Sequence, residues 1–262
     1  MQRWAKTFRY ETDQETRQAY YEHVIWCGHL YDEYLGVAQL RWRCGVRDPK
    51  EPLKECLRVA RYVATKWQSG RTLPHAASTD KERTRDGWPW SDSPDSQDAI
   101  KFPFAKSTIL GVLATGKLDS LLLKFIPKFK DWERHVARGF FWNYPDVALL
   151  HALQHKKAPP GWKRFRDETL AQVSEDVAES FDGYMKLALG KIAPKAIAKT
   201  MEDLAERFDR RALLGDDDMP DSEGPGLANT LCVDFRVAAL ARLRLGEKAL
   251  AGIESIHVRL PT

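Results

Sequence analysis

Apolar side chains recur at steps of three and four residues along most of this 262-residue chain. That spacing is typical of one face of an α-helix, whereas strict alternation would indicate a half-buried strand. Only the end of the chain, residues 253–258, alternates loosely, as a short strand or an extended tail would. The sequence therefore predicts an all-α fold of about eight to ten helices in a single domain, residues 1–262.

Start and stop signals divide the first part of the chain into two helices. The segment Thr12-Asp13-Gln14-Glu15 is a capping-box pattern, and the helix that follows is expected to end before Gly45. A second helix is predicted from Asp48-Pro49-Lys50-Glu51 to Gly70, with Asp as its cap and Pro at its first position. Two helices joined by so short a turn are expected to form an antiparallel hairpin.

The same spacing predicts further helical segments at 102–116, 118–127, 131–138 and 145–159. One long amphipathic helix is expected over 162–190, another over 194–212, and a last helix around 231–241. In the 194–212 helix, Asp203–Arg207 and Glu206–Arg210 have the i,i+4 spacing of favourable ion pairs on a solvent-facing side.

Two stretches, residues 71–98 and 215–226, lack apolar periodicity and are predicted to be long polar loops. Loops of such length are uncommon inside a compact domain and usually have a function or are disordered. The first contains Trp88 and Trp90, although disordered loops are poor in Trp. These two side chains either pin the loop to the helices or act as anchors of a binding interface, where Trp is enriched.

The second loop carries a dense group of acids: Asp216, Asp217, Asp218, Asp221 and Glu223. It does not fit a calcium-binding EF-hand, since the sixth position counted from Asp216 is Asp221 and not the required Gly. The loop is either a solvated segment, a nonspecific cation site, or an acidic patch offered to a basic partner. Acidic charge placed in this way speeds association and can mask a cationic site.

His151 and His155 stand four residues apart, which is the spacing that lets two imidazoles share a metal ion. A zinc protease of the H-E-x-x-H type needs a Glu after its first His, and here that residue is Ala152. No third ligand is apparent, so the two side chains are expected to hold no resident metal ion. No nucleotide-binding or hydrolase motif occurs, and no cofactor or catalytic residue is expected.

The aromatic run 140–145 precedes a helix and has two readings. Aromatic side chains stack on bases of single-stranded nucleic acid, but they also fill the core at helix junctions. A formal charge of +4 is too dilute to indicate nucleic-acid binding by itself, so core packing is expected.

The chain has four cysteines, Cys27, Cys44, Cys56 and Cys232, and none forms a C-x-x-C pair. Its first ten residues are polar and mixed, unlike a secretory signal, and no apolar run approaches the length of a membrane span. We therefore expect reduced thiols, no structural disulfide, no membrane association and a cytoplasmic location.

Two segments of the chain resemble a known class of proteins. Residues 140–153, FFWNYPDVALLHAL, form an aromatic turn that leads into an Ala/Leu helix, and residues 229–246, NTLCVDFRVAALARLRLG, open the last helix. Together they resemble the helical immunity proteins that bacteria encode beside polymorphic or type VI secreted toxins. The resemblance implies an all-helical protein that binds and blocks a cognate toxin and has no catalytic residues. Many inhibitors of nucleases are strongly acidic, whereas this chain is mildly basic.

The favoured hypothesis is therefore an immunity protein whose partner is a secreted toxin, a nuclease or another enzyme that acts in the cytoplasm. The expected contact set is Asp216, Asp217, Asp218, Asp221 and Glu223, with Trp88 and Trp90 as the competing anchors. Two other classes stay open: a helical metal-dependent hydrolase that uses His151 and His155, and a helical scaffold or regulator with a peptide-binding groove.

Overall fold

The computed structural model describes residues 14–43, 50–66, 103–133, 143–193 and 235–246, together with most of 196–207. Within these ranges, all regular secondary structure is helical. The prediction of an all-α fold is confirmed. The loosely alternating segment 253–258 lies outside the described residues.

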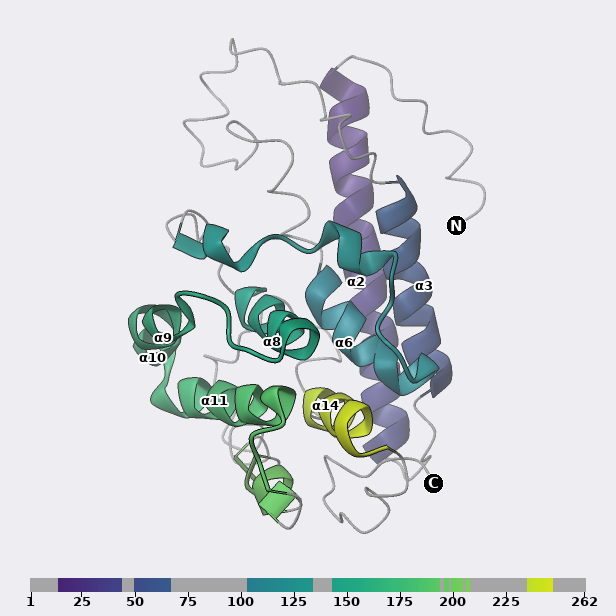
Figure 1. Ribbon diagram of the computed structural model, residues 1–262. Helices are drawn as coiled ribbons and strands as arrows, with labels where there is room; N and C mark the ends of the chain where they lie inside the picture. Colours follow the sequence, from purple (N-terminus) through teal and green to yellow (C-terminus); the bar gives the residue numbers. More distant parts are fainter. Residues whose placement is uncertain are drawn as a thin grey trace.

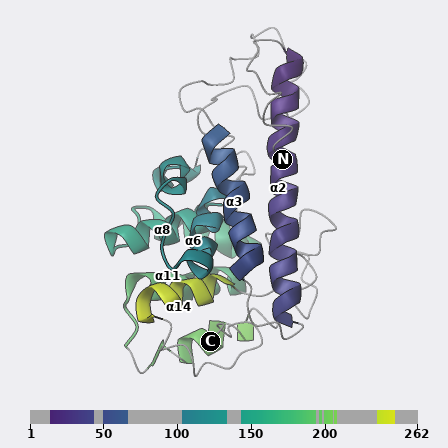
Figure 2. The ribbon, with the colours of Figure 1, turned by 90° about the vertical axis from the view of Figure 1, so that its right-hand side faces the viewer.

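Helices α2 (Gln14–Arg43) and α3 (Lys50–Lys66) lie side by side along one side of the molecule (Figure 1). The connection between them, residues 44–49, is short, so the pair forms the antiparallel hairpin that the sequence predicts. Helix α2 continues past the end of α3 (Figure 2). Both helices bury apolar side chains at helical spacing: Cys27, Tyr31, Leu35 and Ala38 on α2, and Leu53, Leu57, Ala60 and Ala64 on α3.

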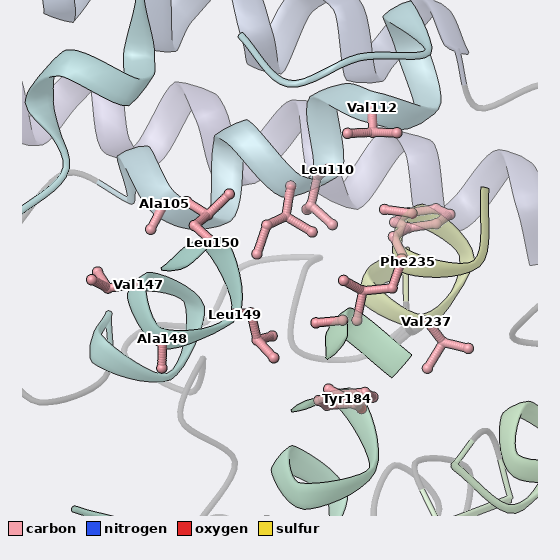
Figure 3. Packing of buried hydrophobic residues seen from close by; sticks show 14 of the residues in the cluster. Ala105, Leu110, Val112, Val147, Ala148, Leu149, Leu150, Tyr184, Phe235 and Val237 are labelled. Carbon is pink, nitrogen blue, oxygen red and sulfur yellow. The ribbon is translucent and has the colours of Figure 1, made fainter. Parts of the chain in front are cut away.

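Four further helices supply much of the remaining core: α6 (Phe104–Thr115), α8 (Tyr144–His155), α11 (Glu175–Leu189) and α14 (Phe235–Leu245). Helix α6 packs against α3 on one side and against α8 and α14 on the other, and α11 packs against both α8 and α14. Side chains of these helices, among them Leu110, Leu149, Tyr184 and Phe235, converge on one another in Figure 3. No described helix is both long enough and apolar enough to cross a membrane.

Helices α6 and α11 end where the sequence predicts, at Gly116 and Gly190, which adopt left-handed backbone conformations. Two arginines in the last turn of α14 reach these ends. Arg242 Nη1 donates a hydrogen bond of 2.6 Å to the Leu113 carbonyl of α6, and Arg244 Nη2 donates to the Ala188 carbonyl of α11. Helix C-termini carry unpaired carbonyls and partial negative charge, so α14 stabilises both ends at once.

Between α6 and α8, the predicted helix at 118–127 is shorter than expected: the chain forms the 3-10 turn η1 (Leu122–Phe125), and a second 3-10 turn, η2 (Phe129–Asp131), follows it. Of the predicted helix at 131–138, residues 132 and 133 are α-helical, and residues 134–138 lie outside the described ranges. The Asp119 carboxylate accepts hydrogen bonds from the backbone amides of Leu121 and Leu122, at 2.9 and 3.1 Å, and pairs with Arg61 of α3 at 2.5 Å. This cap starts a tight turn, and Pro127 cannot continue it as a helix.

The prediction of one continuous helix over 162–190 is wrong. The chain forms α9 (Trp162–Phe165), the π-helical turn η3 (Arg166–Leu170) and α10 (Ala171–Val173), and α11 starts after a break. Ser174 has extended backbone, with φ −164° and ψ 132°. The apolar spacing over 162–190 fits one helix or two helices equally well. Arg166, before the break, forms ion pairs with Glu175 and Asp182 after it, and these contacts stabilise the change of direction.

Candidate functional site

The residues that the sequence singles out as an interface are not among those the structure describes. Asp216, Asp217, Asp218, Asp221 and Glu223 fall outside the described ranges, and so do Trp88 and Trp90. In the chain, the 215–226 loop follows Arg207 and precedes α14, both of which belong to the described frame. The site therefore has to be built from that frame.

A buried ion pair joins Asp146 of α8 to Arg236 of α14. The Arg236 guanidinium donates from Nε to Asp146 Oδ1 at 2.8 Å and from Nη2 to Oδ2 at 3.0 Å. Asp146 is 1% exposed, and the guanidinium also lies 5.7 Å from the centre of the Phe181 ring of α11. Three helices thus meet at one bidentate pair, which is the strongest geometry for an arginine and a carboxylate.

This pair connects α8 and α14, which lie in the sequence segments 140–153 and 229–246. The sequence predicted no contact between these two residues. One sequence feature could have indicated the pair: an acidic residue in the first turn of a mostly apolar helix. Such a carboxylate is buried with the helix and then needs a positively charged partner. The expectation for the aromatic run holds at Tyr144, which is fully buried and packs on Phe129 and Phe165. Residues 140–142 lie outside the described ranges.

Buried phenol and thiol groups on α2 and α3 are held in their neutral forms. Tyr31 is fully buried, and loss of solvation raises the pKa of its phenol well above the ordinary value. Burial also raises the pKa of the Cys56 thiol, which donates a 3.5 Å hydrogen bond to the Tyr31 carbonyl, and raises the pKa of Cys27 to about 11. A nucleophilic cysteine requires a lowered pKa, so these two free thiols have the properties of core residues. Cys44 and Cys232 lie outside the described ranges.

His151 and His155 occupy the last turns of α8, and their ring centroids are 4.4 Å apart. The Nε2 atom of His151 is buried and makes no hydrogen bond to another described residue, while His155 is exposed. Burial lowers the pKa of His151, and His155 and Lys157 lower it further. Among the described residues, no three or more His, Cys, Asp or Glu side chains are grouped to hold a metal ion.

A row of carboxylates forms an acidic edge along η3 and α11: Asp167, Glu168, Glu175, Asp176, Glu179 and Asp182. Arg166 pairs with three of them, with Asp182 at 3.0 Å, with Asp167 at 3.3 Å and with Glu175. Arg164 and Arg207 pair with other members of the row, so six carboxylates are opposed by three arginines and the edge keeps a net negative charge.

Arg207 attaches the helical turns of 196–207 to the acidic edge. It pairs with Glu179 and lies 3.6 Å from Asp176, both on α11. The sequence instead suggested Asp203, four residues earlier on the same helix, as its partner. Arg207 reaches two carboxylates on the neighbouring helix α11, whereas its own helix offers only one carboxylate four residues earlier. The contact with α11 is therefore favoured over the local pair.

A surface depression of about 650 Å³ lies beside the acidic edge, at the start of α9. Its apolar wall includes Pro159 and Trp162, and its charged wall includes Lys163, Arg164, Asp167 and Glu168. Arg164 bridges Glu133 at 2.7 Å and Glu168 at 2.9 Å. The two charges of each sign balance, so this depression selects neither an anionic nor a cationic ligand.

The chain was compared with protein-family models, with curated proteins and with solved structures, and none of these comparisons gives a match.

Proposed function

We propose that this chain is a cytoplasmic immunity protein that binds a cognate secreted bacterial toxin and occludes the toxin's active site. In this proposal the chain is not an enzyme and needs no cofactor. Its helical frame positions a binding surface, and the toxin is a nuclease or another enzyme that acts in the cytoplasm.

The buried pair between Asp146 and Arg236 is the observation that carries this proposal. The two segments that resemble immunity proteins are 76 residues apart in the chain, from residue 153 to residue 229. In the fold, the described residues of these segments lie in or directly beside α8 and α14, which the ion pair ties together and which both pack on α6 and α11. The resemblance therefore covers residues that form one structural unit rather than two unrelated helices.

The charge of the described surface is compatible with a basic partner. The acidic edge presents Glu175 and Asp176 with side-chain exposures of 58% and 68%, and Arg207 ties 196–207, which leads toward the acidic loop, to this edge. A toxin that handles nucleic acid or a phosphorylated cofactor has a cationic active site. Acidic groups on the inhibitor would steer its encounter with such a site and raise the association rate.

Changing the acidic loop tests the proposed contact set. The toxin domain to use is the one encoded beside the gene for this chain, produced in an inactive form. The variant Asp216→Asn/Asp217→Asn/Asp218→Asn should keep the far-ultraviolet circular dichroism and the melting temperature of the parent protein. It should associate with the toxin more slowly and with a flatter salt dependence, because charges at an interface rim mainly set the on-rate.

Two further variants separate the possible interfaces. Glu51→Gln/Glu55→Gln removes one exposed and one partly exposed acid from α3 and serves as a charge control, which should bind like the parent. If the aspartate variant binds unchanged while Trp88→Ala/Trp90→Ala abolishes binding, the contact belongs to the 71–98 loop. If the parent protein neither binds the neighbouring toxin nor protects cells that produce its active form, the immunity function is wrong.

A further inference from the structure

The two histidines at the end of α8 are arranged as a pair of metal ligands. His151 and His155 follow each other by one helical turn, and their ring centroids lie 4.4 Å apart with the ring planes inclined at 47°. Zinc and similar ions bind imidazole nitrogen at about 2.0–2.1 Å, which places two rings that share one ion with their centroids about 4.5–5 Å apart. The observed separation is within about 0.5 Å of that range.

From this geometry we propose that His151 and His155 bind a divalent first-row transition-metal ion, Cu²⁺ most tightly and Ni²⁺ and Zn²⁺ more weakly. Imidazole is a preferred ligand of all three ions, and their affinities for a given nitrogen site follow the Irving–Williams order. This inference is independent of any toxin, since it depends only on the end of α8.

The chemical state of the pair favours binding. Metal ions bind the neutral imidazole, and burial, which lowers the pKa of His151, favours that form. Its Nε2 atom makes no hydrogen bond to another described residue that a metal would have to displace. The exposed His155 ring leaves the pair open to solvent on one side, so an ion has a way in.

Charges near the pair act in both directions. The carbonyls at the C-terminus of α8 carry partial negative charge, which attracts a cation. Lys156, the C-cap residue of α8, and Lys157 repel a cation, but both side chains are exposed and screened by solvent. We therefore expect net binding that strengthens with ionic strength, as screening removes the repulsion from the lysines.

The site supplies two protein ligands, and water completes the coordination. It is thus an exchangeable site and differs from a catalytic zinc centre, which takes three protein ligands. A two-ligand site loses its ion during chelation and dialysis. The proposal accordingly agrees with the expectation that the protein carries no resident metal ion as purified.

Metal titration of the tag-free, chelator-treated chain tests the proposal. Calorimetric titration with Ni²⁺ at pH 7.5 should show one ion per chain, and either His151→Gln or His155→Gln should weaken binding at least tenfold. Electron paramagnetic resonance of the Cu²⁺ complex should show two coordinated imidazole nitrogens in the parent and fewer in each variant. Lowering the pH to 5 should release the ion, because protons compete for both rings.

The matched control is His29→Gln, which removes one exposed histidine from α2 and should leave Ni²⁺ binding unchanged. Circular dichroism verifies that every variant is folded. The proposal is overturned if the parent binds no Ni²⁺ up to millimolar concentration. It is equally overturned if the double variant His151→Gln/His155→Gln binds Ni²⁺ like the parent, since the ion would then be held elsewhere on the chain.

Discussion

At the scale of single residues, Asp146 and Arg236 form an ion pair whose carboxylate is almost fully buried. Removing one partner leaves the other charge buried without compensation, which typically costs about 3–5 kcal/mol. We predict that Asp146→Ala lowers the free energy of unfolding by about that amount. Urea denaturation followed by circular dichroism measures the change.

The matched control for that prediction is Glu51→Ala, which breaks the exposed pair with Lys54 on the surface of α3. Exposed pairs contribute about 0–1 kcal/mol, so this variant should unfold almost like the parent. The double variant Asp146→Leu/Arg236→Met should recover much of the loss, because it leaves no unpaired charge. Equal costs for the buried and the exposed pair would contradict the packing seen at α8 and α14.

Gly183 and Gly28 form a natural pair for testing close packing. A Cβ atom added at Gly183 would lie 2.6 Å from Leu204 Cδ2, whereas one added at Gly28 would have no neighbour within 4 Å. Leu204 is buried, so we predict that Gly183→Ala destabilises the protein by about 1–3 kcal/mol. Gly28→Ala, within α2, should instead stabilise it by about 1 kcal/mol through helix propensity. Thermal unfolding should show a lower melting temperature for Gly183→Ala and a higher one for Gly28→Ala.

At the scale of helices, α14 acts through both of its ends. Arg236 in its first turn binds Asp146, while Arg242 and Arg244 in its last turn bind carbonyls at the ends of α6 and α11. Arg242→Met keeps the aliphatic part of the side chain and removes the donors. We predict a loss of about 1–2 kcal/mol for Arg242→Met, and a similar loss for Arg244→Met.

Chemical denaturation of these variants should give nearly additive losses, because Arg242 and Arg244 reach different helices. Arg58→Met removes an arginine whose ion-pair partner, Glu55, is on the same helix, and this control should cost less than about 0.5 kcal/mol. If Arg242→Met were as mild as Arg58→Met, the contact with Leu113 would contribute nothing to the stability of α6.

Helix positions could be predicted wherever apolar spacing coincided with a clear terminator. The stripe of α3 and the ends of α6 and α11 at Gly116 and Gly190 are examples. The break at Ser174 was missed although Ser174-Glu175-Asp176 has a helix-start composition, with a capping residue before two acids. The apolar spacing continues across the break, and the contacts of Arg166 that fix it are not local in sequence.

At the candidate site, relations between residues close in the sequence could be predicted, whereas contacts between distant residues could not. The sequence placed His151 and His155 correctly on one helix face, because that relation depends only on a spacing of four. It missed the pair of Asp146 with Arg236, 90 residues apart, and assigned Arg207 to the wrong carboxylate. Long-range ion pairs depend on how helices pack, and one sequence contains no direct signal of that.

At the scale of the whole molecule, the described helices share one hydrophobic core. It runs from Cys27 on α2 through α3 and α6 to α8, α11 and α14. The prediction that residues 1–262 form a single domain implies that these helices unfold together. Cooperative unfolding is a measurable property of such a core, since small single domains unfold in one all-or-none transition.

Thiol labelling tests that cooperativity in a Cys44→Ser/Cys232→Ser background, where Cys27 and Cys56 are the remaining cysteines. In the folded protein both thiols are buried, and a pKa of about 11 keeps Cys27 neutral and unreactive at pH 8. Unfolding exposes them and returns their pKa to an ordinary value near 8.5, so they react quickly. We predict that labelling and circular dichroism report the same urea midpoint.

Adding Asp146→Ala to this background makes the test stricter, because the substitution is on α8 whereas the thiols are on α2 and α3. If the helices form one cooperative unit, loss of the Asp146–Arg236 pair should lower the midpoint for thiol exposure as much as the midpoint for loss of helicity. A labelling midpoint that stays in place while the circular dichroism midpoint falls would mean that α2 and α3 unfold independently of α8 and α14. The chain would then contain two domains rather than one.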